Sequence, residues 1–225
     1  MDDNDFPWIK KGDKLFSSGD YFSEAVIHHD ECMNKWDFYA QGYKIVADMI
    51  IEGLEDSPVT VNDKVVYPVC FLYRHYVELK LKEIIFYGSR LLDEPLHITG
   101  KKATHRLDNL WDNHVTPLLQ KIFKDGPQED LSVVREYLIQ YIKIQGDNIF
   151  EEEANIDPTS FSFRYPTDKE GNPNLEGISR INLANLKTSI SNLSGFLEAC
   201  TTAISVYLDE KAELEVEYRL HYEEY

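Results

Sequence analysis

The stretch that most constrains the fold is residues 69–88, which read VCFLYRHYVELKLKEIIFYG. Apolar side chains recur on nearly every face of the helix that this stretch would form. A helix that is apolar all round is normally buried at the centre of a protein. Pro68 suits the first position of a helix, and Gly88 is typical of a helix end. The sequence therefore predicts a central, buried helix from Pro68 to Gly88.

Further stretches show apolar side chains three or four residues apart, which is the spacing of amphipathic helices. They cover 35–54, about 105–123, roughly 130–145, and a last helix that begins after Asn182, a good N-cap residue. The 225 residues suit one domain with a sizeable core. We expect a mainly α fold, an antiparallel helical bundle of about five helices. A single domain would span residues 35–225, after an irregular N-terminal arm at 1–34.

The segment FSFRYPTDKEG, residues 161–171, interrupts this helical pattern. Phe161, Phe163 and Tyr165 alternate with Ser162 and Arg164, a period of two that is typical of a strand. A turn-like sequence follows, so we expect an inserted β-hairpin at about 159–181, before the last helix. Two strands bury too little to be stable alone, so the hairpin would pack on the bundle. Arg164 would then face outward as a partner contact, or cross a cleft to reach Glu78 or a bound anion.

Charged residues also occur inside the predicted central helix. Arg74, Glu78 and Lys82 follow one another at steps of four, so they share one face. Charges that are removed from water need partners or a ligand. The row predicts either structural ion pairing or a ligand site. We take as candidates for ligand or partner binding Arg74, His75, Glu78, Lys82, His105 and Arg164.

Composition and residue spacing argue against several classes of function. The formal net charge is −17, and no basic run is longer than two residues, so RNA or nucleotide binding is possible but disfavoured. The three cysteines are far apart, and the cluster His28 to Cys32 places consecutive side chains on different sides, so we expect no metal site and no cofactor. No apolar run approaches the length of a membrane span. We expect a soluble, cytoplasmic protein that does not bind membranes.

Two motifs resemble the HEPN superfamily, which comprises helical bundle domains. They are the stretch LYRHYVELKLKEII, with Glu78-Leu79-Lys80-Leu81-Lys82, and THRLDNLW, with His105 and Trp111. The resemblance covers roughly residues 35–210. It implies a helical bundle that commonly dimerises, and a role either as a metal-independent ribonuclease or as a non-catalytic protein. A role in a bacterial defence or toxin–antitoxin system, as a partner or antitoxin-like subunit, is also implied.

The ribonuclease motif of that family is an Arg, a polar residue, a short spacer and a His. Arg90 and His97 have the spacing, but Leu91 follows the Arg and Pro95 interrupts the helix. The start of the last helix carries Arg180 without a following His. The sequence therefore predicts a catalytically inactive interaction module that binds a protein partner or a second copy. The alternatives are a divergent ribonuclease, which would use Arg90 and His97 or a composite of Arg74, His75 and His105, and an acidic mimic of DNA.

Overall fold

The computed structural model describes residues 11–27, 34–55, 57–96, 104–124, 126, 128–144 and 154–223. The chain divides into two compact units, Met1–Met33 and Asn34–Tyr225. In the first unit, residues 11–27 are exposed and form turns and extended chain. The carboxylate of Asp20 holds one of these turns by accepting hydrogen bonds from the N–H groups of Phe22 and Ser23.

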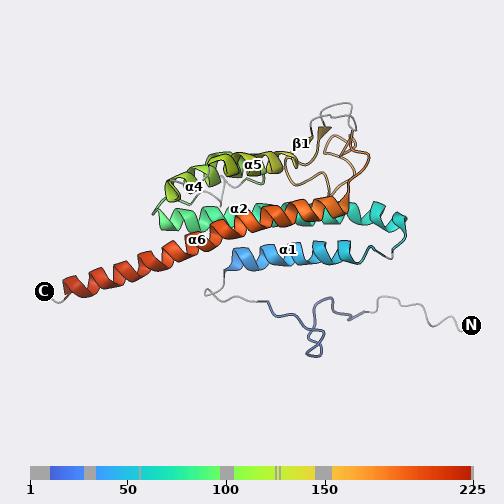
Figure 1. The fold of residues 1–225 in the computed structure, drawn as a ribbon. Coiled ribbons are helices and arrows are strands. Elements are labelled where there is room, and N and C mark those ends of the chain that lie inside the picture. Colours follow the sequence, from blue (N-terminus) through green and yellow to red (C-terminus); the bar gives the residue numbers. More distant parts are fainter. Residues whose placement is uncertain are drawn as a thin grey trace, which may run out of the picture. The chain divides into compact units, whose positions relative to one another are not determined.

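The second unit is built around α2 (Val59–Leu91), which is the buried central helix that the sequence predicts. Against it pack α1 (Lys35–Glu52), α6 (Leu183–Glu223) and a third helical stretch (Figure 1). The predicted bounds of α2 were wrong at both ends. It begins at Val59, so Pro68 lies inside the helix and leaves one backbone hydrogen bond unmade, and it continues past Gly88 to Leu91.

The third helical stretch is continuous but not uniform. It runs through α3 (Leu107–Leu110), the π-helical turn η2 (Trp111–Val115) and α4 (Thr116–Ile122). Pro117 lies in the first turn of α4, immediately after the π turn. Because proline cannot donate a backbone hydrogen bond, a change of helical pitch at this point lets the chain continue without a break. Five helical stretches are present in the described part of the chain when this one is counted once, as a mainly α bundle requires.

After α5 (Gln128–Ile139) come two very short strands, β1 (Lys143–Ile144) and β2 (Ala154–Asn155). They pair antiparallel, with Lys143 opposite Asn155 and Ile144 opposite Ala154. This ladder lies upstream of the segment for which we predict a hairpin. It brings the chain back to the bundle just before Ile156 and Asp157.

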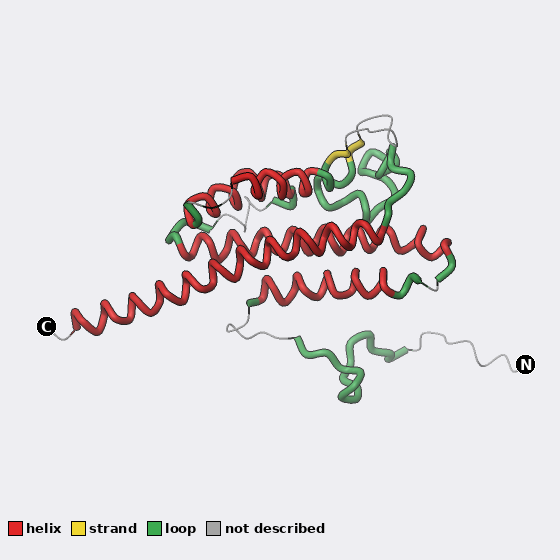
Figure 2. The backbone as a smooth tube through the Cα atoms, viewed as in Figure 1, coloured by secondary structure: helices red, strands yellow, loops and turns green. Residues whose placement is uncertain are grey.

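The predicted hairpin at 159–181 was wrong. This segment is a series of turns, drawn as loop in Figure 2, with a single isolated bridge between Thr167 and Pro173. Prolines at 166 and 173 cannot donate to a strand ladder, and the side chain of Asp168 binds the N–H groups of Glu170 and Asn172 instead. The aromatic side chains also fail to share one face, since Phe163 is buried whereas Tyr165 is exposed.

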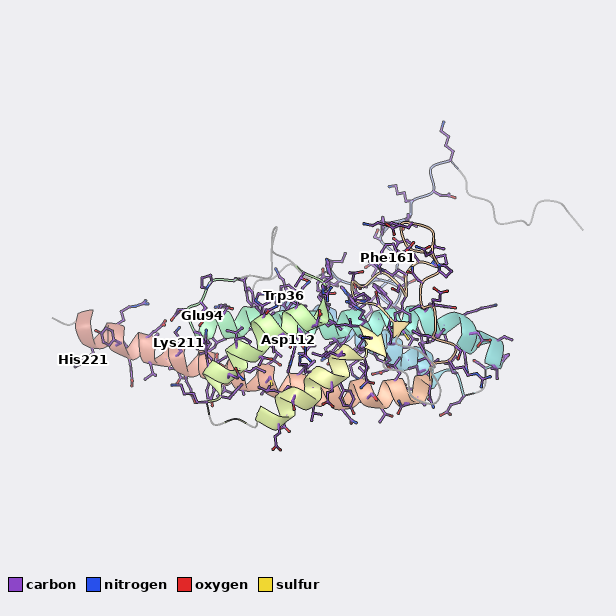
Figure 3. All side chains as sticks on the ribbon, turned by 90° about the horizontal axis from the view of Figure 1, so that it is seen from above. Trp36, Glu94, Asp112, Phe161, Lys211 and His221 are labelled. Carbon is purple, nitrogen blue, oxygen red and sulfur yellow. The ribbon has the colours of Figure 1, made fainter. Side chains whose placement is uncertain are left out.

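The core of the second unit has two parts. The larger one gathers side chains of α2, such as Tyr73, Val77 and Leu81, with Trp111 of η2 and Leu197 of α6. Figure 3 shows how densely the side chains fill the space between these helices. A smaller cluster joins Cys70 of α2 to Ile156 and Phe163, and this cluster fixes the loop segment on the helix. Within the described residues, no helix combines the length and the apolar character that crossing a lipid bilayer requires.

Candidate binding site

The charged row of α2 forms a buried cluster with two loops. Arg74 and Glu78 are completely buried, and Nη1 of Arg74 donates to Oε2 of Glu78 at 3.1 Å. Nζ of Lys82 donates to the other oxygen of Glu78 at 2.7 Å, and Nδ1 of His105 lies 2.7 Å from that same oxygen. The structure therefore brings together four of the predicted site residues; the helical spacing of four predicts the contacts among Arg74, Glu78 and Lys82, and His105 joins them from the loop before α3.

Asp157 completes this cluster, and the sequence analysis missed it. Its side chain is buried; its carbonyl oxygen accepts from Nε of Arg74 at 3.1 Å, and its carboxylate lies 3.5 Å from the same nitrogen. The carboxylate also accepts hydrogen bonds from the N–H groups of Phe161 and Ser162. The only signal in the sequence is that Pro158 follows an Asp, which indicates a turn but gives no partner.

The cluster balances its charges internally. Arg74 donates from Nε to Asp157, from Nη1 to Glu78, and from Nη2 to the carbonyl oxygen of His105 at 2.7 Å. Burial by itself would raise the pKa of Glu78, but the hydrogen bonds and charges of Lys82 and His105 outweigh it and lower this pKa. A buried carboxylate with such donors stays ionised at neutral pH. The geometry therefore matches the structural alternative, in which the row pairs inside the protein and not at the edge of an open cleft.

A second buried cluster lies on the opposite side of α2 and connects it to α1. Nζ of Lys80 lies 2.9 Å from a carboxylate oxygen of Asp37 and 2.6 Å from one of Glu83. Nδ2 of Asn34 donates to the other oxygen of Glu83 at 2.6 Å. Lys80 and Glu83 are three residues apart on α2, but their contacts with Asn34 and Asp37 come from the start of α1, which the sequence does not place beside them.

Burial affects the two ionised groups of this second cluster differently. It raises the pKa of Glu83, and the hydrogen bond and charge of Lys80 only partly offset that effect. Burial lowers the pKa of Lys80, but two carboxylates, those of Glu83 and Asp37, outweigh it and raise this pKa overall. The difference follows from the number of partners, since the lysine has two opposite charges beside it and Glu83 has one.

The remaining predicted site residues lie apart from the buried Arg74 cluster. His75 packs between the rings of Phe71 and Tyr43, and burial lowers its pKa, which the charge of Glu78 only partly offsets. Arg90 is exposed on α2, over the ring of Phe86. His97 lies outside the described residues. The proposed composite of Arg74, His75 and His105 thus contains a buried guanidinium whose three nitrogens each donate a hydrogen bond to the protein.

Arg164 does not reach Glu78. Its guanidinium lies 5.6–5.9 Å from the ring centres of Phe71, Phe161 and Tyr165, within cation–π range of all three. Phe161 and Tyr165 stack on each other at 4.4 Å. Arg164 therefore lies on the same side of the chain as Phe161 and Tyr165. The expectation that a strand would place Arg164 on the opposite face from these rings was wrong.

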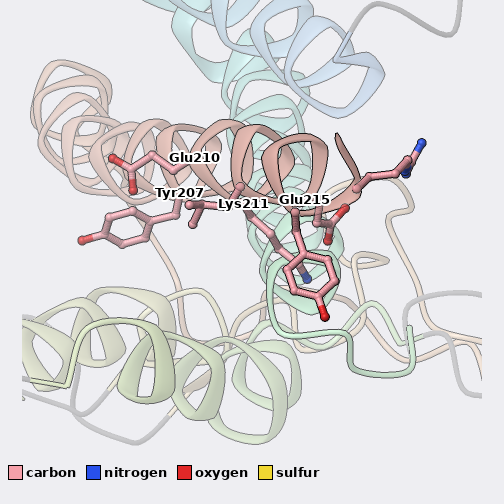
Figure 4. A pocket seen from close by; sticks show the side chains of 7 residues that line it. Tyr207, Glu210, Lys211 and Glu215 are labelled. Atoms are coloured by element: carbon pink, nitrogen blue, oxygen red, sulfur yellow. The ribbon is translucent and has the colours of Figure 1, made fainter. Parts of the chain in front are cut away.

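The distal half of α6 presents an open face that is formed by residues of α6 alone: Tyr207, Glu210, Lys211, Leu214, Glu215, Tyr218 and Arg219 (Figure 4). Lys211 connects this part of α6 to the bundle, with its Nζ 3.1 Å from the carbonyl oxygen of Leu91 and 2.6 Å from a carboxylate oxygen of Asp93. Figure 3 shows α6 continuing from Lys211 to His221. Every residue from Ala212 to His221 is exposed.

Metal ligation finds no support in the described ranges, where no group of three or more His, Cys, Asp or Glu side chains is arranged to hold an ion. The cluster from His28 to Cys32 lies outside those ranges. No family model, no curated protein and no solved structure matches this chain, so the HEPN resemblance stays an expectation drawn from its two motifs.

Proposed function

We propose that this chain is a non-catalytic, HEPN-like interaction module that binds a basic protein partner through the distal half of α6. The partner would belong to a bacterial defence or toxin–antitoxin system, as the resemblance implies, with this chain as its antitoxin-like subunit. The observation that carries the proposal is the exposure of apolar side chains along the distal half of α6. Leu214, Val216 and Leu220 are 64%, 54% and 63% exposed on the part of the helix that continues past Lys211.

Exposed apolar side chains that lie together mark interaction surfaces in soluble proteins. Tyr207 and Leu214 are seven residues apart, the spacing that places two side chains on the face that a helix presents to a partner helix. From Asp209 to His221 every residue except Lys211 is exposed.

Charge selects the kind of partner. Residues 209–225 contain Asp209, Glu210, Glu213, Glu215, Glu217, Glu223 and Glu224 against Lys211 and Arg219. Two copies of this segment would place like charges together, which is unfavourable at an interface. A basic amphipathic helix would instead pair its charges with these carboxylates and its apolar face with Leu214. We therefore favour a basic partner over a homodimer through this segment.

The non-catalytic part of the proposal is supported by the Arg74 cluster. A ribonuclease needs a general acid and base within reach of the substrate hydroxyl. Here Arg74 is buried, and its donors bind Glu78, Asp157 and the backbone of His105. A side chain held in this way stabilises the fold, and the Arg74 guanidinium is not available to a substrate phosphate.

The test is co-purification of the full chain from its own cells, with Leu214→Glu as the disrupting variant. Val59→Glu is the matched control, because Val59 is also an exposed aliphatic residue on a helix, at the start of α2. We expect wild type and Val59→Glu to retain a basic protein that Leu214→Glu loses, and added salt to weaken the complex. A concentration-dependent homodimer that Leu214→Glu abolishes would overturn the choice of partner. Cleavage of single-stranded RNA that Arg90→Ala abolishes would overturn the non-catalytic role.

A further inference from the structure

The turns of residues 160–181 border a half-open cavity against the N-terminal half of α2. The cavity is about 500 Å³ in volume, within the range of small-molecule sites. Val66 and Tyr67 of α2 form one wall. The polar part of the lining comes from the loop segment: Ser162, Arg164, Asn174, Ser179 and Arg180.

The charge of this cavity is opposite to that of the protein. The chain has a formal net charge of −17, yet the lining contains two arginines and no Asp or Glu. Nor does Arg164 or Arg180 form an ion pair with any residue in the described ranges, whereas Arg74, Arg106 and Arg135 each have a carboxylate partner. The aromatic rings around Arg164 hold its guanidinium in place without neutralising it. Two unneutralised guanidinium groups on one cavity are suited to an anion.

A second, more apolar cavity adjoins the first. It is about 230 Å³ in volume and shares Phe163, Arg180 and Ile181 with it. Its other walls include Cys70 of α2, and Leu186 and Ile190 of α6. The hydroxyl of Tyr141 is buried and also belongs to a residue of this wall, and it has no hydrogen-bond partner in the part of the chain that the structure describes. A buried hydroxyl without a partner is costly, and this one belongs to a residue of the cavity wall, so a ligand atom that accepts its hydrogen bond would remove that cost.

We propose that these adjoining cavities form one binding site for a small aromatic anion, with its carboxylate or phosphate between Arg164 and Arg180. The aromatic ring lies in the apolar cavity, where Phe163 and Leu186 cover it. A hydrogen-bond acceptor on the ring, opposite the charged group, meets the hydroxyl of Tyr141. This site is independent of the proposed partner surface on α6.

The shape of the site favours a bipartite ligand over a free inorganic anion. An inorganic anion would occupy only the cavity that Arg164 and Arg180 line. It would leave the apolar cavity empty and the Tyr141 hydroxyl without a hydrogen-bond partner. A ligand with a ring buries apolar surface in addition to its ion pairs, and each source of affinity can be removed separately by substitution.

Isothermal titration of the full chain tests the proposal with four probes: benzoate, 4-hydroxybenzoate, phenyl phosphate and inorganic phosphate. We expect the aromatic anions to bind more tightly than inorganic phosphate. The affinity of benzoate compared with that of phenyl phosphate shows whether the site prefers a carboxylate or a phosphate. Arg180→Gln should weaken every aromatic anion by at least about tenfold, since it removes a charge-assisted hydrogen bond. The matched control is Lys169→Gln, which removes the same charge from an exposed residue of the same loop that does not line either cavity.

Tyr141→Phe tests the apolar cavity separately. We expect 4-hydroxybenzoate to bind more tightly than benzoate to wild type, and the two to bind equally to Tyr141→Phe, because the acceptor then has no donor. Thermal unfolding of each variant checks that its fold is intact. The proposal is overturned if no probe binds wild type at about 10 mM, a concentration that detects even very weak sites. It is also overturned if Arg180→Gln and Lys169→Gln bind alike, or if inorganic phosphate binds as tightly as the aromatic anions.

Discussion

Arg74 and Asp157 are separated by 83 residues, yet Nε of Arg74 donates to the carbonyl oxygen of Asp157 at 3.1 Å inside the protein. This contact fastens the loop that follows β2 to the central helix. A second contact, from Nη2 of Arg74 to the carbonyl oxygen of His105, fastens the chain just before α3. One buried guanidinium thus holds two loops on α2.

Replacement of Arg74 by Met should destabilise the protein strongly. The change leaves the carboxylates of Glu78 and Asp157 buried with fewer partners, and breaking a buried ion pair costs about 3–5 kcal/mol. Urea unfolding measures the difference. Arg106→Met is the control, because Arg106 is 52% exposed in its pair with Asp108, and exposed pairs contribute about 1 kcal/mol or less. Equal losses in the two variants would contradict the structural role of the Arg74 cluster.

Glu78→Gln should lose stability in a pH-dependent manner. The pKa of Glu78 in the folded protein lies below its ordinary value of 4.5, so ionised Glu78 stabilises the fold above that value. This contribution disappears as the pH falls through the folded-state pKa. We therefore expect the advantage of wild type over Glu78→Gln to be largest near neutral pH and to shrink in acid. Urea unfolding at several pH values between about 2.5 and 7 measures it.

For Glu83→Gln the difference in unfolding free energy from wild type should depend on pH in the opposite direction. Burial raises the pKa of Glu83 above 4.5, so the folded protein holds this proton more tightly than the unfolded chain. Its contribution to stability is present at low pH and is lost as the pH rises through the folded-state pKa. The advantage of wild type over Glu83→Gln should therefore fall with rising pH, in the same series of unfolding measurements. Parallel slopes for Glu78→Gln and Glu83→Gln would show that burial does not dominate at Glu83.

Gly88→Ala should stabilise the protein. Gly88 lies within α2, and a Cβ there would meet carbon atoms of Ile122 and Leu118 at 3.5–3.7 Å, which is ordinary van der Waals contact. Alanine is favoured over glycine inside a helix by about 0.5–1 kcal/mol. Gly42→Ala in α1 is the control, since a Cβ there meets nothing within 4 Å and reports helix propensity alone. A lower melting temperature for Gly88→Ala than for wild type would mean that α4 lies closer to α2 than the structure has it.

Asn182→Ala should weaken the start of α6. Oδ1 of Asn182 accepts a hydrogen bond from the N–H group of Asn185 at 3.0 Å, which is the capping contact expected from the sequence. Loss of such a cap costs about 1 kcal/mol. Asn182→Asp should retain most of the stability, because a carboxylate accepts the same bond; urea unfolding distinguishes the two variants.

Features that depend on neighbours along one helix could be predicted from the sequence. The apolar faces of residues 69–88 placed α2 in the centre, and steps of four placed Arg74, Glu78 and Lys82 together. Asn182 marked the start of α6. Pro68 and Gly88 do not mark the ends of α2, because packing against α1 and α4 keeps the chain helical beyond both residues.

By itself the sequence determined what a repeating backbone geometry fixes: the helical class, the central helix and the residues that share its faces. Only the tertiary structure decided which loops meet that helix. Asp157 reaches Arg74, and Arg164 shares a cavity with Arg180, because the turns of 156–181 follow their own hydrogen bonds and not a strand ladder. The physical reason is that helical neighbours are set by a fixed period, whereas contacts between distant segments depend on the path of irregular chain, which no local periodicity encodes.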